Sequence, residues 1–119
     1  MTDAAKVQQL PVTNPESRDV LMDLLEQRTA AGMPLMLNRD LYDDLVARVA
    51  LGQLKYGVRL QSFNGRDVLL DLKQELEDGV MYSHQAVMQG YRVAHIRDML
   101  IRLLESLKQT KEAHENEKG

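Results

Sequence analysis

The fold is decided by residues 64–89, which read NGRDVLLDLKQELEDGVMYSHQAVMQ. The pair Asn64-Gly65 is a turn signal, and the residues after it predict one long helix that Asn64 caps. On the helical wheel, the plainly solvated positions of this helix are Lys73, Glu77 and His84.

An acidic row runs along the opposite side of the same helix. Asp71, Glu75 and Asp78 fall, together with Tyr82, within about 60° of one another on the wheel. Apolar residues flank the row: Val68, Leu69, Leu72, Leu76 and Val80 on one side, Leu70 and Met81 on the other. Carboxylates inside an apolar surface are costly to bury as anions. The sequence therefore predicts a compensating cation, either basic side chains or a metal ion.

The composition of the 119 residues indicates the class of fold and the cellular compartment. Hydrophobic residues make up 44% and charged residues 28%, the balance of one globular domain. The net charge of −3 gives no electrostatic reason to expect nucleic-acid binding, and the absence of cysteine excludes thiolate metal sites. The sequence shows no secretory signal and no apolar run of about 20 residues, so we expect a soluble cytoplasmic protein without membrane contact.

Helix signals divide the chain into an arm, four helices and a tail. Asn14-Pro15-Glu16 predicts a helix start, and Gly32 and Pro34 predict its end. The helices are expected at residues 15–31, 39–56, 65–89 and 91–111, between a flexible or extended arm at 1–14 and a frayed charged tail at 112–119.

Caps and glycines support these boundaries. Asn38 caps the second helix and Gly57 stops it, and Gly90 marks the break after the third. Gly79, inside the third helix, costs about 1 kcal/mol relative to Ala, which predicts close approach of another helix or of a ligand.

The fold class predicted is all-α, a single four-helix bundle-like domain at residues 15–111. The second helix is apolar over a wide arc, which indicates burial on more than one side. We therefore expect a bundle that also forms a homo-oligomer, a dimer or a tetramer.

The acidic row has two interpretations. Glu75 and Asp78, with Asp71 one turn earlier, offer the hard oxygen ligands that Mg²⁺ prefers. A partner set could come from the second helix, from Asp40, Asp43 or Asp44. Alternatively, the acids pair with basic side chains and only tie helices together; the candidates are Arg48, Lys55 and Arg66.

The basic residues of the second helix also have two interpretations. Arg48 and Lys55 share a face with Asp44 and could hold a polyphosphate. The simpler alternative is an ion pair between Asp44 and Arg48, one turn apart. The three histidines, His84, His95 and His114, show no metal-ligand spacing, and the chain has no glycine-rich phosphate loop.

Three consecutive motifs carry a resemblance to a known family. They are Arg48-x-x-x-Gly52-x-x-Lys55-Tyr56-Gly57, Leu60-x-x-Phe63-Asn64-Gly65-Arg66-Asp67 and Asp71-x-x-x-Glu75-x-x-Asp78-x-x-x-Tyr82. Over residues 40–89 the chain resembles small phage-type members of the MazG-like group, all-α nucleoside triphosphate pyrophosphohydrolases. The resemblance implies a helical dimer or tetramer that cleaves (d)NTPs between the α- and β-phosphates with Mg²⁺, in the host cytoplasm if phage-encoded.

The resemblance also implies roles for individual residues. Glu75 and Asp78 match the second acidic motif of the family and would be catalytic metal ligands. Asp43, Asp44 and Asp71 would complete the metal set. Arg48 and Lys55 would face the substrate phosphates.

Departures from the family pattern leave a competing function open. The first acidic motif has Asp43 and Asp44 where a Glu pair is expected, and position 74 is Gln. The alternative is an inactive helical relative that acts as a small phage-type adaptor for another protein. Nucleic-acid binding through the fourth helix is disfavoured by the acids among its basic residues.

Overall fold

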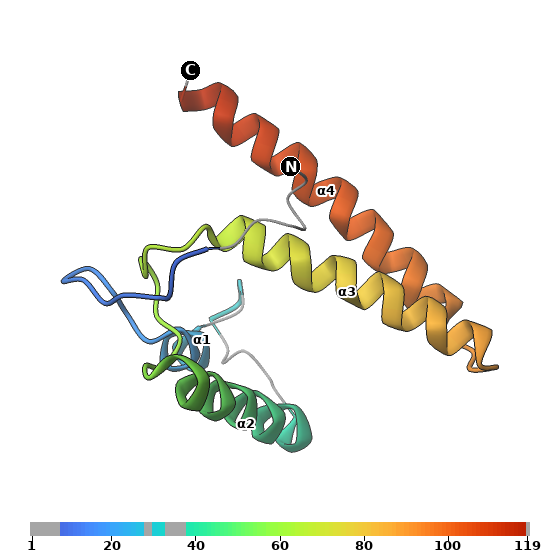
Figure 1. The fold of residues 1–119 in the computed structure, drawn as a ribbon, viewed down its shortest axis with the longest axis horizontal. Coiled ribbons are helices and arrows are strands. Elements are labelled where there is room, and N and C mark those ends of the chain that lie inside the picture. Colours follow the sequence, from blue (N-terminus) through green and yellow to red (C-terminus); the bar gives the residue numbers. More distant parts are fainter. Residues whose placement is uncertain (1–7, 28–29, 33–37, 119) are drawn as a thin grey trace. The chain divides into compact units, whose positions relative to one another are not determined.

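The computed structural model describes residues 8–27, 30–32 and 38–118. The described residues form four helices and no strand, which confirms the all-α class (Figure 1). The helices are α1 (Val20–Glu26), α2 (Arg39–Tyr56), α3 (Val68–Met88) and α4 (Ala94–Lys118). In this part of the chain every helix is too short or too polar to span a membrane. The chain forms two compact units, Gln8–Arg66 and Asp67–Gly119, each described here by itself.

The start of α1 differs from the prediction because the preceding residues pair with a distant segment. Ser62 N–H donates to the Arg18 carbonyl (2.9 Å), and Val20 N–H donates to the Leu60 carbonyl (3.1 Å). Backbone groups used in this antiparallel pairing are not available to a helix. Asp19 therefore caps α1, accepting from Met22 N–H at 3.0 Å, and the predicted start at Pro15 is wrong.

The end of α1 is also earlier than predicted. The helix ends at Glu26, and residues 30–32 form a turn. Residues 28–29 and Pro34, which the prediction used, lie outside the described residues.

Helix α2 has the predicted bounds, whereas α3 begins later than predicted. Asn38 Oδ1 accepts from Leu41 N–H at 2.8 Å, and Gly57 closes α2 with a φ of +79°. Asp67, rather than Asn64, caps α3 by accepting from Leu70 N–H at 3.1 Å. Asn64 acts instead in the turn before α3, where its Oδ1 accepts from Arg66 N–H.

The described part of the N-terminal arm is extended and bound to this turn. Val12 N–H donates to the Asn64 carbonyl at 2.8 Å, and Gln9 Nε2 donates to the Gly65 carbonyl at 3.0 Å. Arg66 Nη1 returns a bond to the Gln9 carbonyl at 2.7 Å. These contacts hold residues 8–14 against the loop that connects α2 to α3; residues 1–7 lie outside the described part.

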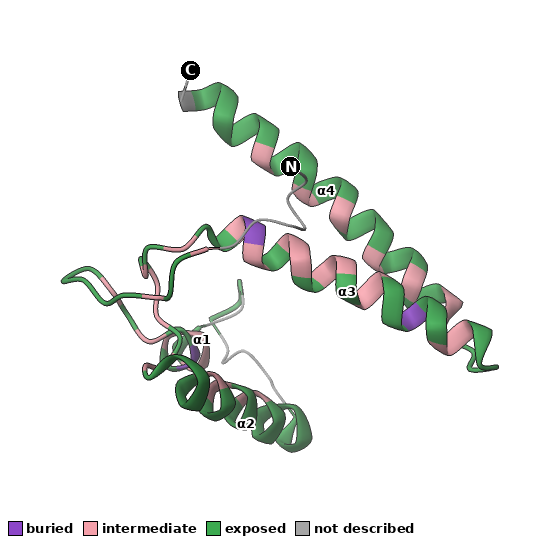
Figure 2. Ribbon diagram, viewed as in Figure 1, coloured by how far each residue is buried: buried purple, intermediate pink, exposed green. Residues whose placement is uncertain are grey.

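Helices α3 and α4 form an antiparallel hairpin (Figure 1). Their facing positions are buried or half-buried and recur at intervals of three and four residues, the pattern of a two-helix seam (Figure 2). They are Leu69, Lys73, Leu76, Val80, Ser83 and Val87 on α3, and Arg97, Leu100, Leu104, Leu107 and Lys111 on α4.

Two predictions about α3 and α4 are wrong. Lys73 and Glu77 are half-buried beside α4 rather than solvated, whereas His84 is exposed, with its Nδ1 3.2 Å from Arg97 Nη1. Helix α4 runs from Ala94 to Lys118 instead of 91–111. Glu and Lys residues recur three and four apart in its last turns, a spacing that favours helix.

The close approach predicted at Gly79 is confirmed. A Cβ at this position would lie 3.2 Å from Leu100 Cδ1.

We expect Gly79→Val to destabilise the protein by about 1–3 kcal/mol through overpacking, measured by urea denaturation. The matched control is Gly52→Val in α2, where nothing lies within 4 Å of the added Cβ and no loss is expected. Equal losses in both variants would contradict the packing account.

The Asp19–Arg59 ion pair makes the free energy of unfolding depend on pH in the acid range. Arg59, whose Nε donates to Asp19 Oδ2 at 2.6 Å, lowers the pKa of Asp19, and Met22 N–H lowers it further. The stabilisation by this pair is therefore complete above the ordinary pKa of an Asp, and it is lost as the pH falls through the lowered pKa of Asp19.

We expect Asp19→Asn, which keeps a capping side chain, to melt at a lower temperature than wild type at pH 7. The difference from wild type should shrink at pH 3 in melts followed by circular dichroism; a constant difference would exclude the linkage.

Candidate functional site

The acidic row of Asp71, Glu75 and Asp78 lies on the side of α3 that faces away from α4. Glu75 and Asp78 are exposed, and Asp71 is half-buried. Large hydrophobic side chains beside the row are exposed too: Val68 (71%), Leu72 (45%), Met81 (71%) and Tyr82 (70%). The unit thus presents carboxylates within an uncovered apolar surface.

Glu75 and Asp78 have no neutralising partner within their own unit. Among the described residues of Asp67–Gly119, neither carboxylate forms an ion pair or a hydrogen bond. Lys73, the nearest lysine in sequence, pairs instead with Glu77 at 3.3 Å. Among the described side chains of this unit, none is therefore the cation expected from the sequence.

The other predicted site residues lie on α2, in the unit Gln8–Arg66. Asp43, Asp44, Arg48 and Lys55 are all exposed there. Asp43 pairs with Arg39 at 3.1 Å, and Lys55 Nζ lies 5.1 Å from the centre of the Tyr56 ring. Within the described part of α2, the ion pair considered between Asp44 and Arg48 does not form.

The structure thus groups the predicted residues into two sets. Asp71, Glu75 and Asp78 follow one face of α3, and Asp43, Asp44, Arg48 and Lys55 belong to α2. Each set is confined to one helix, and the two helices belong to different units.

The carboxylates of the acidic row could supply part of the coordination shell of a Mg²⁺ ion. No three Asp, Glu or His side chains in the described ranges lie close enough together to hold a metal ion by themselves. However, Mg²⁺ usually takes one or two protein carboxylates and completes its octahedron with water and substrate phosphates. Glu75 and Asp78, one turn apart and unpaired, supply two such carboxylates.

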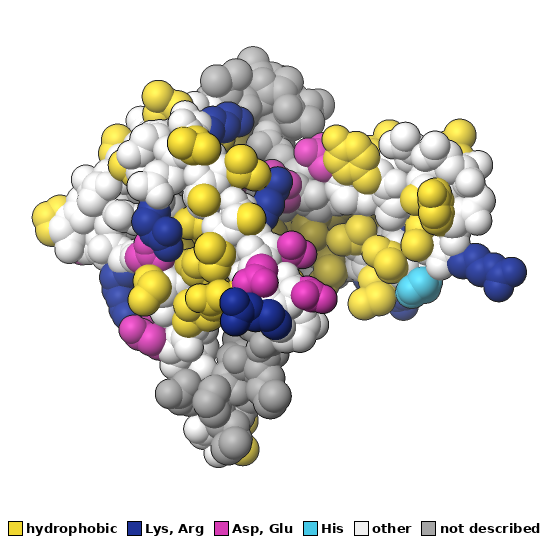
Figure 3. Space-filling view, turned by 90° about the horizontal axis from the view of Figure 1, so that it is seen from below, with side chains coloured by type: hydrophobic (Ala, Val, Ile, Leu, Met, Phe, Trp, Pro, Cys, Tyr) yellow, Lys and Arg dark blue, Asp and Glu magenta, His cyan; other side chains and the backbone are white. Residues whose placement is uncertain are grey.

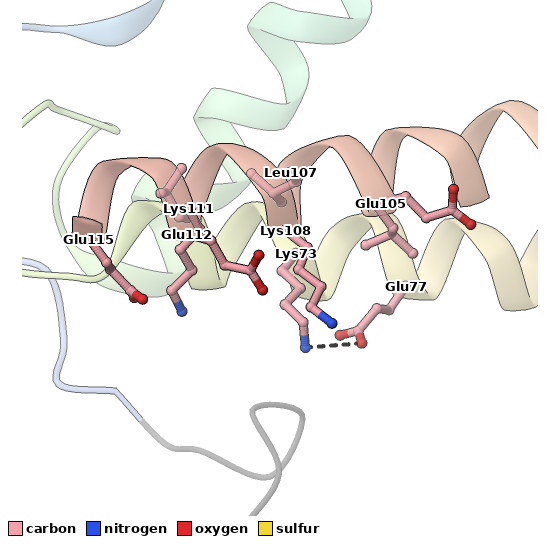
Figure 4. Close-up of a pocket in the computed structure, with 10 residues that line it drawn as sticks. Lys73, Glu77, Glu105, Leu107, Lys108, Lys111, Glu112 and Glu115 are labelled. Carbon is pink, nitrogen blue, oxygen red and sulfur yellow. Dashed lines mark hydrogen bonds and ion pairs between the residues drawn. The ribbon is translucent and has the colours of Figure 1, made fainter. Parts of the chain in front are cut away.

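A charged groove on the hairpin was not predicted. It has a volume of about 470 Å³ and runs between α3 and α4 over an apolar floor (Figure 4). Its charged lining consists of Lys73, Glu77, Glu105, Lys108, Lys111, Glu112 and Glu115. Three lysines against four glutamates leave no positive excess, so the groove is a poor site for a polyphosphate.

A signal for this groove was present in the sequence. Lys73 and Glu77 are one turn apart, and Lys73 continues the spacing of Leu69 and Leu76 along the seam. Long charged side chains can cover an apolar seam with their methylene stems while their charged ends stay in water.

Comparison of the chain with protein-family models, curated proteins and solved structures gives no match.

We expect Mg²⁺ to raise the melting temperature of the protein through Glu75 and Asp78. With a dissociation constant near 1 mM, 10 mM Mg²⁺ would stabilise the folded state by about 1.4 kcal/mol. The double variant Glu75→Gln/Asp78→Asn should lose this increase in thermal melts. The control Glu112→Gln/Glu115→Gln removes the same charge from the groove and should keep it. Loss of the effect in the control alone would place the ion in the groove instead.

Proposed function

We propose that the protein is a Mg²⁺-dependent nucleoside triphosphate pyrophosphohydrolase that converts (d)NTPs to (d)NMP and pyrophosphate. The observation that carries this proposal is the pair Glu75 and Asp78, two exposed carboxylates one turn apart that have no ion pair or hydrogen bond among the described residues of their unit. An enzyme of this kind would clear or remodel a nucleotide pool in the cytoplasm, the host cytoplasm if phage-encoded.

The residues of the two units have different roles in this proposal. Glu75 and Asp78 would hold Mg²⁺, Asp71 would assist them, and Asp43 and Asp44 would complete the acidic set. Arg48, with its planar fork, and Lys55, as a point charge, hold the substrate phosphates. Both basic side chains are exposed on α2, and neither is committed to an acidic partner among the described residues.

The chemistry is displacement at the α-phosphorus by water. When bound, Mg²⁺ supplies charge neutralisation of the phosphates and helps to activate the attacking water. The protein supplies acceptor oxygens on α3 that orient the ion, and cations on α2 that bind the negatively charged leaving group. A bundle-like homo-oligomer, a dimer or a tetramer, is part of the same proposal.

A second candidate function is a helical adaptor without catalysis. The observation that favours it is the exposed surface of α2, which has no buried residue and exposes Leu51 (58%) and Leu54 (84%) (Figures 2 and 3). Exposed apolar residues that form a contiguous patch can provide a surface for another protein. Gln74 and the two aspartates that replace the first Glu pair are consistent with lost activity.

Activity measurements separate the two candidates. We expect pyrophosphate release from at least one (d)NTP with Mg²⁺, and a loss of roughly 100-fold or more in kcat/KM for Glu75→Gln, because a metal ligand is removed. Glu77→Gln, which removes the same charge from the other side of α3, should keep most of the activity. Absence of pyrophosphate release with all (d)NTPs would leave the adaptor as the function.

A further inference from the structure

The turn before α3 contains the pair Asn64-Gly65, which sets Asn64 apart from the other asparagines of the chain. Of the four asparagines in the sequence, Asn64 alone precedes a glycine. Asn14 precedes a proline, which has no N–H, and Asn38 and Asn116 precede residues with long side chains. Because glycine has no Cβ, its backbone nitrogen is the least hindered one that a preceding asparagine side chain can approach.

The hydrogen bonds of the turn leave the reactive atoms of this pair free. Asn64 Oδ1 accepts from Arg66 N–H at 3.1 Å, whereas neither Asn64 Nδ2 nor Gly65 N–H forms a hydrogen bond among the described residues. The Arg66 donor polarises the side-chain carbonyl, as the donors of an oxyanion hole do, so the electrophile is Asn64 Cγ. Gly65 is exposed and Asn64 is half-buried, so solvent has access to the turn within its unit.

We propose that Asn64 is a site of spontaneous deamidation, a covalent modification in which Gly65 N attacks Asn64 Cγ. Solvent base removes the proton of Gly65 N–H as the new N–Cγ bond forms, and the Cγ–Nδ2 bond then breaks. The Nδ2 group takes a proton from water and leaves as ammonia, and a five-membered succinimide ring remains. Water opens this ring, so the sequence of steps requires no oxidant, reductant or cofactor.

The ring has two carbonyls, and opening at each gives a different product. Attack of water at Cγ breaks the N–Cγ bond and gives an ordinary aspartate at position 64. Attack at the main-chain carbonyl of position 64 gives isoaspartate, in which the main chain continues through Cβ and Cγ and is one carbon longer. Both products replace a neutral amide with a carboxylate, and only isoaspartate changes the path of the backbone.

A longer main chain at this point affects the arm, because residues 8–14 lie directly against Gly65. Gln9 Nε2 donates to the Gly65 carbonyl at 3.0 Å, and Arg66 Nη1 donates to the Gln9 carbonyl at 2.7 Å. The fit is close, since a Cβ on Gly65 would lie 2.6 Å from Gln9 Nε2 and 3.1 Å from Val12 Cγ2. Isoaspartate displaces Gly65 and Arg66 relative to these partners and removes the side-chain acceptor of Arg66 N–H.

The consequence of the isoaspartate product is therefore release of the arm from the loop that precedes α3. All the groups involved belong to the unit Gln8–Arg66, so the inference needs no contact with the other unit. It goes beyond the proposed function and does not depend on it, because no residue of the acidic row takes part.

Mass spectrometry of the full chain tests the reaction. Trypsin cuts after Arg59 and Arg66 and releases residues 60–66, a peptide in which Asn64 is the single asparagine. After incubation of the folded protein at mildly alkaline pH, this peptide should gain the mass difference between an amide and an acid. Isoaspartyl methyltransferase should methylate part of the product. The tryptic peptide that contains Asn38 is the internal control and should stay unchanged.

Two comparisons make the result decisive. Because the turn leaves the reactive atoms unpaired, the folded protein should convert within about tenfold of the rate of the synthetic peptide 60–66. Asn64→Gln, whose longer side chain would have to close a six-membered ring, should not convert in the same time. A slower wild type, equal conversion at Asn38, or a product without isoaspartate would overturn the proposal.

Amide hydrogen exchange tests the release of the arm. Val12 N–H donates to the Asn64 carbonyl at 2.8 Å, so it exchanges slowly while the arm is bound. In the isoaspartate form, separated by chromatography, this amide should exchange at least about tenfold faster. Asn64→Asp is the matched control, since it adds the same charge without lengthening the main chain and should keep the exchange rate of wild type. Unchanged exchange in the isoaspartate form, or equally fast exchange in Asn64→Asp, would overturn release by the longer backbone.

Discussion

The contact between Gly79 and Leu100 is the constraint on which the α3–α4 unit depends. It brings α3 and α4 close together and fixes their register, since a side chain at Gly79 would meet Leu100 at 3.2 Å. Leu76, Val80 and Val87 are half-buried on the side of α3 toward α4, and the acidic row lies on the opposite side. The same contact therefore determines which face of α3 is available for chemistry.

The exposed acidic row connects the packing of the hairpin to its proposed chemistry. A carboxylate in water is well solvated, but Glu75 and Asp78 lie among exposed Val68, Leu72 and Met81. Covering this apolar surface removes water from the carboxylates, which then require a cation. The proposed divalent ion meets that requirement.

The sequence predicted the features that depend on local interactions. Helix α2 was predicted with its bounds because Asn38 and Gly57 are strong local signals. The start of α1 was missed because Arg59, 40 positions along the chain, holds Asp19 in an extended pairing. No local signal at Pro15 reports that contact.

The candidate site was predictable to a similar extent. The spacing of the acidic row on one face of α3 follows from helical periodicity alone, and the structure has that helix. The half-buried positions of Lys73 and Glu77 were missed because the position of α4 depends on a tertiary contact. Periodicity within α2 or within α3 cannot predict whether residues of the two helices belong to one site.

Paramagnetic broadening by Mn²⁺ tests the central claim, that the acidic row holds a divalent ion, most directly. Mn²⁺ substitutes for Mg²⁺ at oxygen sites and broadens the amide signals of nearby residues in nuclear magnetic resonance spectra. At low Mn²⁺ the amides of residues 71–82 should broaden first, before those of Glu112 and Glu115 in the groove. Earlier broadening at those α4 glutamates, or uniform broadening along the chain, would contradict the account.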